Sequence, residues 1–259
     1  MAVDNAQYEH LAAIYDSCLQ IPVRRCDTAN FLAAIDPVNG RHVLDLATGT
    51  GYFARTMARL GAAHVVGVDV SEGMLQVARH LSPEGSVRYE TGDVFSAMLQ
   101  GLGEGKEEEE GAAEGKFDLV TGVWCLNYAA NRDMMLTAWR NIARFLKPGG
   151  RFVGIVPGPF MEWLDEKEVC YGFSYERVEK VEDGWLVKKT LHAEQGPITF
   201  KAYVLNEDIY RSAAGAAGMK DVRIDKPEIV PKMEGDEDEA YWERFMSRPL
   251  FSVMTAVKA

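Results

Sequence analysis

The sequence has few cysteines, no long apolar run and no basic segment. Its four cysteines are far apart and form no Cys-x-x-Cys pair, so the pattern predicts neither a disulfide framework nor a zinc or other metal site. No eighteen consecutive residues are apolar, and the N-terminal MAVDNAQYEH is too polar for a signal peptide. We therefore expect a cytoplasmic protein with no membrane partner.

The net charge of −11 is concentrated in two short stretches. Residues 104–114 contain six Glu and one Lys, and residues 234–239 contain five acidic residues. The rest of the chain is close to neutral, so no basic face is available for nucleic acid, and we expect no such partner. Residues 101–116 are rich in Gly and Glu without apolar periodicity, which predicts a disordered acidic insertion.

Residues 42–69 carry the clearest pattern in the chain. An apolar run at 43–46 turns through Gly49 and Gly51 into a segment with helical spacing, and a second apolar run ends on Asp69. This order predicts a strand, a glycine-rich turn, a helix and a second strand. Such a βαβ unit binds a nucleotide-like cofactor, because glycines let a ligand approach the backbone and the acid accepts hydrogen bonds from ribose hydroxyls.

Two classes of cofactor fit this unit. Gly49, Gly51 and Ala54 match the G-x-G-x-x-A spacing of dinucleotide enzymes. Asp45 lies four residues before Gly49, however, where a carboxylate would repel a pyrophosphate at the helix N-terminus. A cationic ligand is favoured instead, and S-adenosylmethionine, with a sulfonium and an ammonium group, is one.

The remaining elements continue an α/β series. Helical segments are expected in two pieces within residues 4–35, broken at Ile21-Pro22, and again at residues 71–80, 132–146, 207–217 and 240–246. Later strands are expected at residues 86–90, 117–124, 151–156, 222–230 and 251–257. Residues 1–36 are expected to form a helical cap over the cofactor side of the sheet.

Residues 157–206 interrupt this series. Segments 172–181, 185–192 and 197–205 read as strands joined by turns at Asp183-Gly184 and Gln195-Gly196. We expect an antiparallel meander that covers the acceptor side of the cofactor pocket. The alternative is pairing with a second subunit, so both a monomer and a homodimer remain open.

The sequence resembles class I S-adenosylmethionine-dependent methyltransferases, and within them the toxoflavin-synthase-like group of small-molecule enzymes. The resemblance implies one methyltransferase domain over residues 1–259, with a Rossmann-like seven-stranded sheet in the order 3-2-1-4-5-7-6. The segments that carry it are Ile14-Tyr15-Asp16, Asp45-Leu46-Ala47-Thr48-Gly49-Thr50-Gly51, Val66 to Ser71, Leu126-Asn127-Tyr128-Ala129, Leu146 to Phe152, Tyr171-Gly172-Phe173 and Tyr241 to Phe245.

The same resemblance implies a set of site residues. Asp69 would hold the ribose, Asp93 the adenine amino group, and the turn from Ala47 to Gly51 the methionine portion, which Asp45 would orient. The full set of cofactor residues is Tyr15, Arg24, Asp45, Ala47, Gly49, Gly51, Asp69, Val70, Met74, Asp93, Val94 and Val123. The expected acceptor residues are Trp124, Asn127, Tyr128, Trp163 and Tyr171, with Tyr128 as the side chain that would assist catalysis.

The expected function is N- or O-methylation of a small heterocyclic or secondary metabolite. One alternative uses the bound sulfonium as a fixed charge that steers a cyclisation without methyl transfer. A nucleic-acid or protein methyltransferase is less favoured, because the chain has no basic groove and the meander leaves little room for a bulky acceptor. A non-catalytic binding protein is least favoured, because both cofactor acids and the glycine turn are present.

Overall fold

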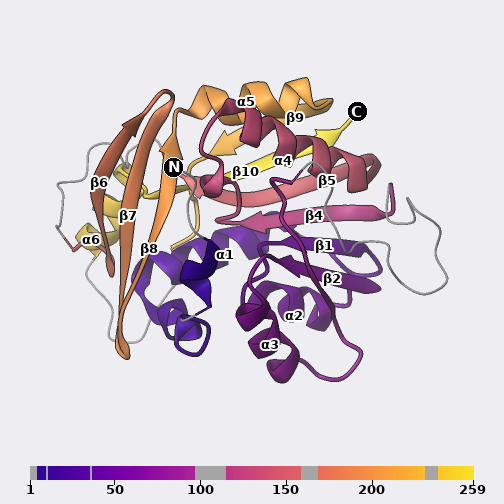
Figure 1. Ribbon diagram of the computed structural model, residues 1–259, viewed down its shortest axis with the longest axis horizontal. Helices are drawn as coiled ribbons and strands as arrows, with labels where there is room; N and C mark the ends of the chain where they lie inside the picture. Colours follow the sequence, from indigo (N-terminus) through magenta and orange to yellow (C-terminus); the bar gives the residue numbers. More distant parts are fainter. Residues whose placement is uncertain (1–4, 10, 36, 97–114, 159–168, 231–238) are drawn as a thin grey trace.

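The computed structural model describes residues 5–9, 11–35, 37–96, 115–158, 169–230 and 239–259 (Figure 1). Trp163 and most of the predicted acidic insertion at 101–116 lie outside the described residues. Within the described part of the chain, no helix combines the length and the apolar character needed to cross a bilayer.

The main sheet has seven strands in the order β3-β2-β1-β4-β5-β10-β9. Strands β1 to β5 are parallel to their neighbours, whereas β10 is antiparallel to both β5 and β9. Because β9 and β10 are the sixth and seventh strands of this sheet, the predicted order 3-2-1-4-5-7-6 is confirmed. The strands are β1 His42–Leu46, β2 His64–Asp69, β3 Arg88–Thr91, β4 Phe117–Val123, β5 Leu146–Pro157, β9 Met219–Asp225 and β10 Phe251–Lys258.

Helices cover both faces of this sheet (Figure 1). Alternating strand residues serve the two faces, so that Val43 belongs to one apolar core and Leu44 to the other. The first core includes residues of α1, α2, α3 and α6, and the second is built with α4 and α5. These helices are α1 Pro22–Ile35, α2 Tyr52–Arg59, α3 Glu72–Leu81, α4 Arg132–Phe145, α5 Glu207–Ala216 and α6 Glu239–Ser247.

The N-terminal segment is less helical than predicted. The break at Ile21-Pro22 is correct, because Ile21 is extended and Pro22 begins α1, where its missing N–H costs nothing. Before it, the chain forms two short 3-10 helices, η1 Asn5–Tyr8 and η2 Tyr15–Gln20.

Two strand boundaries differ from the prediction. Strand β5 begins at Leu146, ahead of the Pro148-Gly149-Gly150 sequence, because Leu146 already pairs with Phe117 before a shift in register. The chain leaves α4 through the extended Leu146 and not through a glycine, although Gly149 does have a φ of 74°. Strand β9 ends at Asp225, opposite Val253 of β10, so the prediction of a strand up to residue 230 was wrong.

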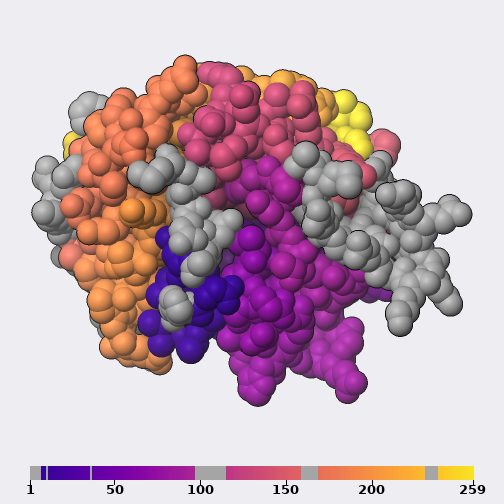
Figure 2. Space-filling model, viewed as in Figure 1, coloured from indigo at the N-terminus to yellow at the C-terminus, as the bar shows by residue number. Residues whose placement is uncertain are grey.

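A second sheet confirms the predicted meander. It has three antiparallel strands, β6 Phe173–Val181, β7 Gly184–Ala193 and β8 Gly196–Leu205. Its buried Val187, Leu191 and Ile198 extend the core that contains α1. In Figure 2 the meander, in orange, forms one flank of the molecule, next to the indigo N-terminal segment and across from the purple residues 42–96.

Candidate cofactor and acceptor site

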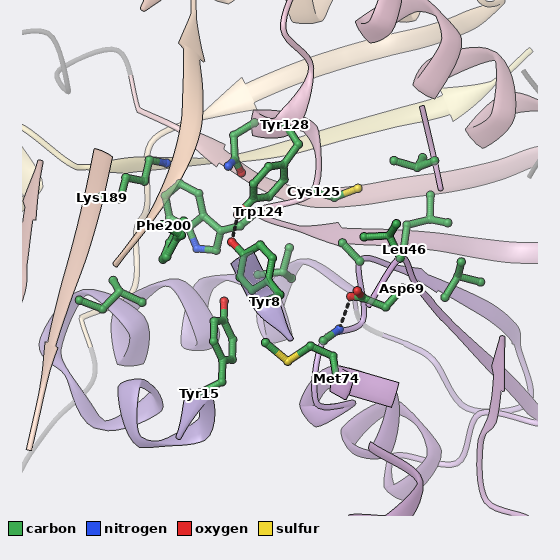
Figure 3. A pocket seen from close by; sticks show the side chains of 18 of the residues that line it. Tyr8, Tyr15, Leu46, Asp69, Met74, Trp124, Cys125, Tyr128, Lys189 and Phe200 are labelled. Atoms are coloured by element: carbon green, nitrogen blue, oxygen red, sulfur yellow. Dashed lines mark hydrogen bonds between the residues drawn. The ribbon is translucent and has the colours of Figure 1, made fainter. Parts of the chain in front are cut away.

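One pocket lies at the carboxyl ends of the central parallel strands, where open α/β sheets bind ligands. Its empty space, which is continuous with bulk solvent, is about 1130 Å³. Strands β1, β2 and β4 supply one wall, η1 and η2 a second, and the meander strands β7 and β8 a third (Figure 3). The site therefore joins segments that are far apart in the sequence.

Most of the residues expected from the sequence line this pocket. Those that do are Tyr15, Arg24, Ala47, Gly49, Asp69, Val70, Met74, Asp93, Val94, Val123, Trp124, Asn127 and Tyr128. Asp45, Gly51 and Tyr171 are not part of its lining. Tyr171 packs against the aromatic rings of Tyr241 and Phe245, with centroids 4.6 and 4.8 Å away.

Two acids stand at the tips of neighbouring strands. At the end of β2, Asp69 accepts the backbone N–H groups of Gly49 at 2.8 Å and Ser71 at 2.9 Å. Burial raises the pKa of Asp69, and these backbone donors act against that rise. Beyond β3, Asp93 accepts the N–H of Phe95 at 2.9 Å. Asp69 is thus held by its own turn and by the glycine turn after β1, and Asp93 by its own turn. Both carboxylates still have lone pairs for ligand hydroxyl or amino groups.

The glycines of the first turn have different tasks. Gly49 has a φ of 56°, and a Cβ added there would meet nothing within 4 Å, so its open side faces the pocket. Gly51 has a φ of 79°, and a Cβ would come within 2.2 Å of the Tyr89 hydroxyl. The missing side chain at Gly51 therefore serves the packing of Tyr89 and not the approach of a ligand.

Asp45 lies beneath the turn, between β1 and β4. Its two carboxylate oxygens accept hydrogen bonds from the hydroxyls of Thr48 and Thr121, both at 2.7 Å. It is 2% exposed, and burial raises its pKa to about 6. Asp45 therefore connects the glycine turn to the neighbouring strand β4 through these two hydrogen bonds. Its side chain does not line the pocket.

Three tyrosines meet in the middle of the pocket. The hydroxyls of Tyr8 and Tyr128 are hydrogen-bonded, and the Tyr8 ring packs edge-on to Tyr15 and Tyr128, with centroids 6.1 and 5.9 Å away (Figure 3). Burial raises the pKa of Tyr128 well above its usual value. Its hydroxyl therefore stays protonated at neutral pH, where it is suited to hydrogen bonding and not to removing a proton.

A buried chain of polar contacts fixes the end of β4. Arg24 pairs with Asp27 at 2.7 Å, and the indole N–H of Trp124 donates to the same carboxylate oxygen at 2.7 Å. Trp124 has a φ of 58°, unusual for a bulky residue, and this hydrogen bond helps to hold it there. The charge of Arg24 is thus neutralised by Asp27.

Asn127 lines the pocket with an amide group that lacks hydrogen-bond partners. It is 1% exposed, and neither its amide nitrogen nor its amide oxygen has a hydrogen-bond partner among the described residues. The Nε of Arg24 is in the same state. Buried polar groups are normally paired, so both are consistent with a polar ligand in the pocket.

The N-terminal segment connects two walls of the pocket. The carboxylate of Glu9 accepts from the Ser71 hydroxyl at 2.7 Å and from the Gly73 N–H at 3.0 Å, at the start of α3. On the other side, the Gln7 amide exchanges two hydrogen bonds with the backbone of Lys201 in β8, at 2.8 and 3.2 Å. Residues 5–9 therefore span from the start of α3 to the meander.

Sequence reasoning missed several residues of the site, among them Tyr8, Asp27, Lys189 and Phe200. For Lys189 a signal existed, since Val187, Lys189 and Leu191 alternate on one face of a strand whose other members there are apolar. The partners of Asp27 and Tyr8 lie about a hundred residues away, and local spacing carries no trace of them.

The strand order, the antiparallel final strand and the glycine turn are those of class I S-adenosylmethionine-dependent methyltransferases. The CcbJ methyltransferase from Streptomyces caelestis has the same fold, with a TM-score of 0.63 over 99% of this chain and all of that one, at 21% identity. Residues 43–150 match the family described as a methyltransferase domain. Residues 43–150 therefore form a methyltransferase domain, and the chain as a whole has the fold of class I S-adenosylmethionine-dependent methyltransferases, as predicted.

Two curated relatives match part of the chain. Demethylmenaquinone methyltransferase of Tropheryma whipplei is 37% identical over 114 residues, which are 44% of this chain and 41% of that protein. Ubiquinone biosynthesis O-methyltransferase of Thiobacillus denitrificans is 39% identical over 116 residues, 44% of this chain and 43% of that protein. The chain thus spans about two fifths of the length of these relatives. The toxoflavin-synthase-like grouping stays a prediction.

Proposed function

We propose that this protein transfers the methyl group of S-adenosylmethionine to a nitrogen or oxygen of a small acceptor. The observation that carries this is a pocket with two acids, Asp69 and Asp93, at one end and a mainly aromatic wall from the N-terminus, the end of β4 and the meander at the other. The named relatives support methyl transfer to small molecules, since they are methyltransferases of menaquinone and ubiquinone biosynthesis.

The residues at the first end fit the cofactor. The carboxylates of Asp69 and Asp93 offer acceptors for ribose hydroxyls and for an adenine amino group, and Gly49 leaves backbone space beside them. The unpaired amide of Asn127 and the Nε of Arg24 offer contacts for the amino and carboxylate groups of the methionine portion. The bound cofactor supplies a methyl group made electrophilic by its sulfonium.

The aromatic end fits a flat acceptor. Tyr8, Tyr15, Trp124 and Phe200 bury apolar area there, and burying such area stabilises by ~25 cal/mol per Å². The residues of the pocket hold the acceptor heteroatom in line with the methyl group and exclude water. Alignment alone supplies effective molarities of order 10⁵ to 10⁸ M, so positioning accounts for much of the acceleration.

The test is binding of S-adenosylhomocysteine, the demethylated cofactor, to wild type and to Asp69→Asn by calorimetry. The substitution removes the charged acceptor for two ribose hydroxyls, and hydrogen bonds to charged groups are worth ~1.5 to 3 kcal/mol. Affinity should fall about tenfold to a hundredfold. Asp208→Asn is the control, because Asp208 has a side chain that is 69% exposed and lies outside the pocket lining.

Equal affinity of Asp69→Asn and wild type would remove Asp69 from the site and reopen the dinucleotide interpretation. Turnover is then followed with a panel of small aromatic acceptors, by mass spectrometry of both products. Methyl transfer requires S-adenosylhomocysteine to appear in step with methylated acceptor. Loss of acceptor without S-adenosylhomocysteine would instead support the sulfonium-steered cyclisation.

A further inference from the structure

One lysine, Lys189, is buried in the pocket. It lies on β7, is 2% exposed and lines the cavity. No carboxylate of the described residues lies within ion-pairing distance of its ammonium, and no described hydrogen-bond acceptor pairs with it. Its neighbour Lys188 faces the other way and pairs with Glu176 at 2.7 Å.

The side chain of Lys189 is directed at the acceptor wall. Its Nζ lies over the Trp124 ring, 4.6 Å from the centroid (Figure 3). The edge of that ring donates its N–H to Asp27, so the carboxylate makes the ring face richer in electrons and strengthens its attraction for a cation. Lys189 is therefore held in one place, and its amine faces the pocket.

An ordinary buried lysine extends its stem along apolar surface and returns its ammonium to bulk water. Lys189 does not, and burial without a counter-charge lowers its pKa to about 7. A large fraction of the molecules then carries a neutral amine at neutral pH. A neutral amine in a closed pocket is a base, and it becomes a stable cation once an anion lies beside it.

We propose that Lys189 binds an acidic O–H or N–H group of the acceptor and takes its proton as the methyl group is transferred. The acceptor class is a flat ring that carries a phenolic or enolic hydroxyl or an acidic heterocyclic N–H. This inference rests on the proposed function and assigns the acceptor chemistry of the same pocket.

The step balances in protons and electrons. The lone pair of the Lys189 amine takes the proton of the acceptor heteroatom. That heteroatom forms a new bond to the methyl carbon while the bond between the methyl carbon and sulfur breaks. Sulfur keeps the electron pair of the broken bond. Lys189 leaves the step as an ammonium ion and returns its proton to solvent.

The charges of the pocket favour an acidic acceptor over a basic one. The acids Asp69 and Asp93 lie at the cofactor end, Arg24 is neutralised by Asp27, and Tyr128 stays protonated. A basic amine acceptor would bring a second cation against Lys189, whereas an acidic acceptor forms an ion pair that replaces part of the lost hydration.

The probe is 4-nitrophenol, a flat acidic phenol whose ionised form alone absorbs violet light. It is titrated with the full chain near pH 6, where the free probe is mainly protonated. We expect the bound probe to show the phenolate band in wild type, and 4-nitroanisole, which has no acidic proton, to bind at least tenfold more weakly.

Lys189→Met keeps the volume and apolar stem while removing the base. In that variant the phenolate band should disappear and affinity for 4-nitrophenol should fall tenfold or more, whereas Lys188→Met should match wild type. S-adenosylhomocysteine binding, measured on the same samples, should be equal in all three proteins, and it also reports that Lys189→Met is folded.

Several outcomes would overturn the proposal. They are a probe that does not bind, a probe bound to wild type as the neutral phenol, and a phenolate band that survives in Lys189→Met. Failure of the proposed function would give a different result. S-adenosylhomocysteine would then bind to none of the three proteins, whatever the outcome of the 4-nitrophenol titration.

Discussion

Asp45→Asn should make the protein less sensitive to pH. Asp45 is 2% exposed, and burial raises its pKa from 3.8 to about 6. A carboxyl whose folded pKa is raised stabilises the fold fully below its unfolded pKa, and this contribution is lost as pH rises through the folded value. The difference of about two units, at 1.36 kcal/mol each, corresponds to about 3 kcal/mol lost between about pH 4 and pH 7.

The substitution removes the ionisable group while leaving an amide for Thr48 and Thr121 to bond. The free energy of unfolding is measured in urea for wild type and variant at pH 4 and pH 8. Between these two pH values, the free energy of Asp45→Asn should rise by about 3 kcal/mol relative to that of wild type. Asp118→Asn is the control with the opposite sign. Partial burial raises the pKa of Asp118, but Lys147 and the His42 N–H outweigh this and lower it.

A stability difference that does not change with pH would refute the argument, because it would mean that Asp45 is not desolvated.

The same variant also tests the expectation that Asp45 orients the cofactor. Its carboxylate is outside the pocket lining, so we expect affinity for S-adenosylhomocysteine to change by less than about fivefold, or about 1 kcal/mol. A tenfold loss would restore the role inferred from the sequence.

Two further substitutions test the middle of the pocket and its turn. Tyr128→Phe should lower kcat less than about tenfold, because the hydroxyl stays protonated and bonds to Tyr8; a loss of a hundredfold in steady-state kinetics would give it an acid–base role. Gly51→Ala should cost about 2 kcal/mol or more in urea unfolding, from its positive φ and the clash with Tyr89, whereas Gly49→Ala should cost about 1 kcal/mol from the φ alone. Equal costs would show that Tyr89 yields without penalty.

The sheet could be predicted from the sequence because its signals are local. The run at 43–46, the turn through Gly49 and the acid at Asp69 lie within one βαβ unit, and β1 and β2 are buried on both faces over most of their length. The end of β9 was placed wrongly because it depends on where β10 stops pairing, which is a long-range property.

The pocket was predictable only in part for the same reason. Acids at strand ends reach a ligand by topology alone, so Asp69 and Asp93 were found. The role of Asp45 depends on Thr121, which is contributed by a different strand. The position of Tyr171 depends on how α6 packs, which no spacing in the sequence encodes. The alternation around Lys189 places it on an apolar face of its strand, but only the packing of the meander brings that face to the pocket.

The N-terminal span from Glu9 to Gln7 has a consequence for the rates of ligand exchange. It ties the first turn of α3 to β8 through hydrogen bonds that are largely solvent-exposed, each worth a net ~0.5 to 1.5 kcal/mol. Detaching it costs far less than unfolding the sheet, and it carries Tyr8 away from Tyr128 as it leaves. We therefore expect substitutions at Glu9 and Gln7 to shorten the residence time of bound ligands while the groups that line the pocket stay the same.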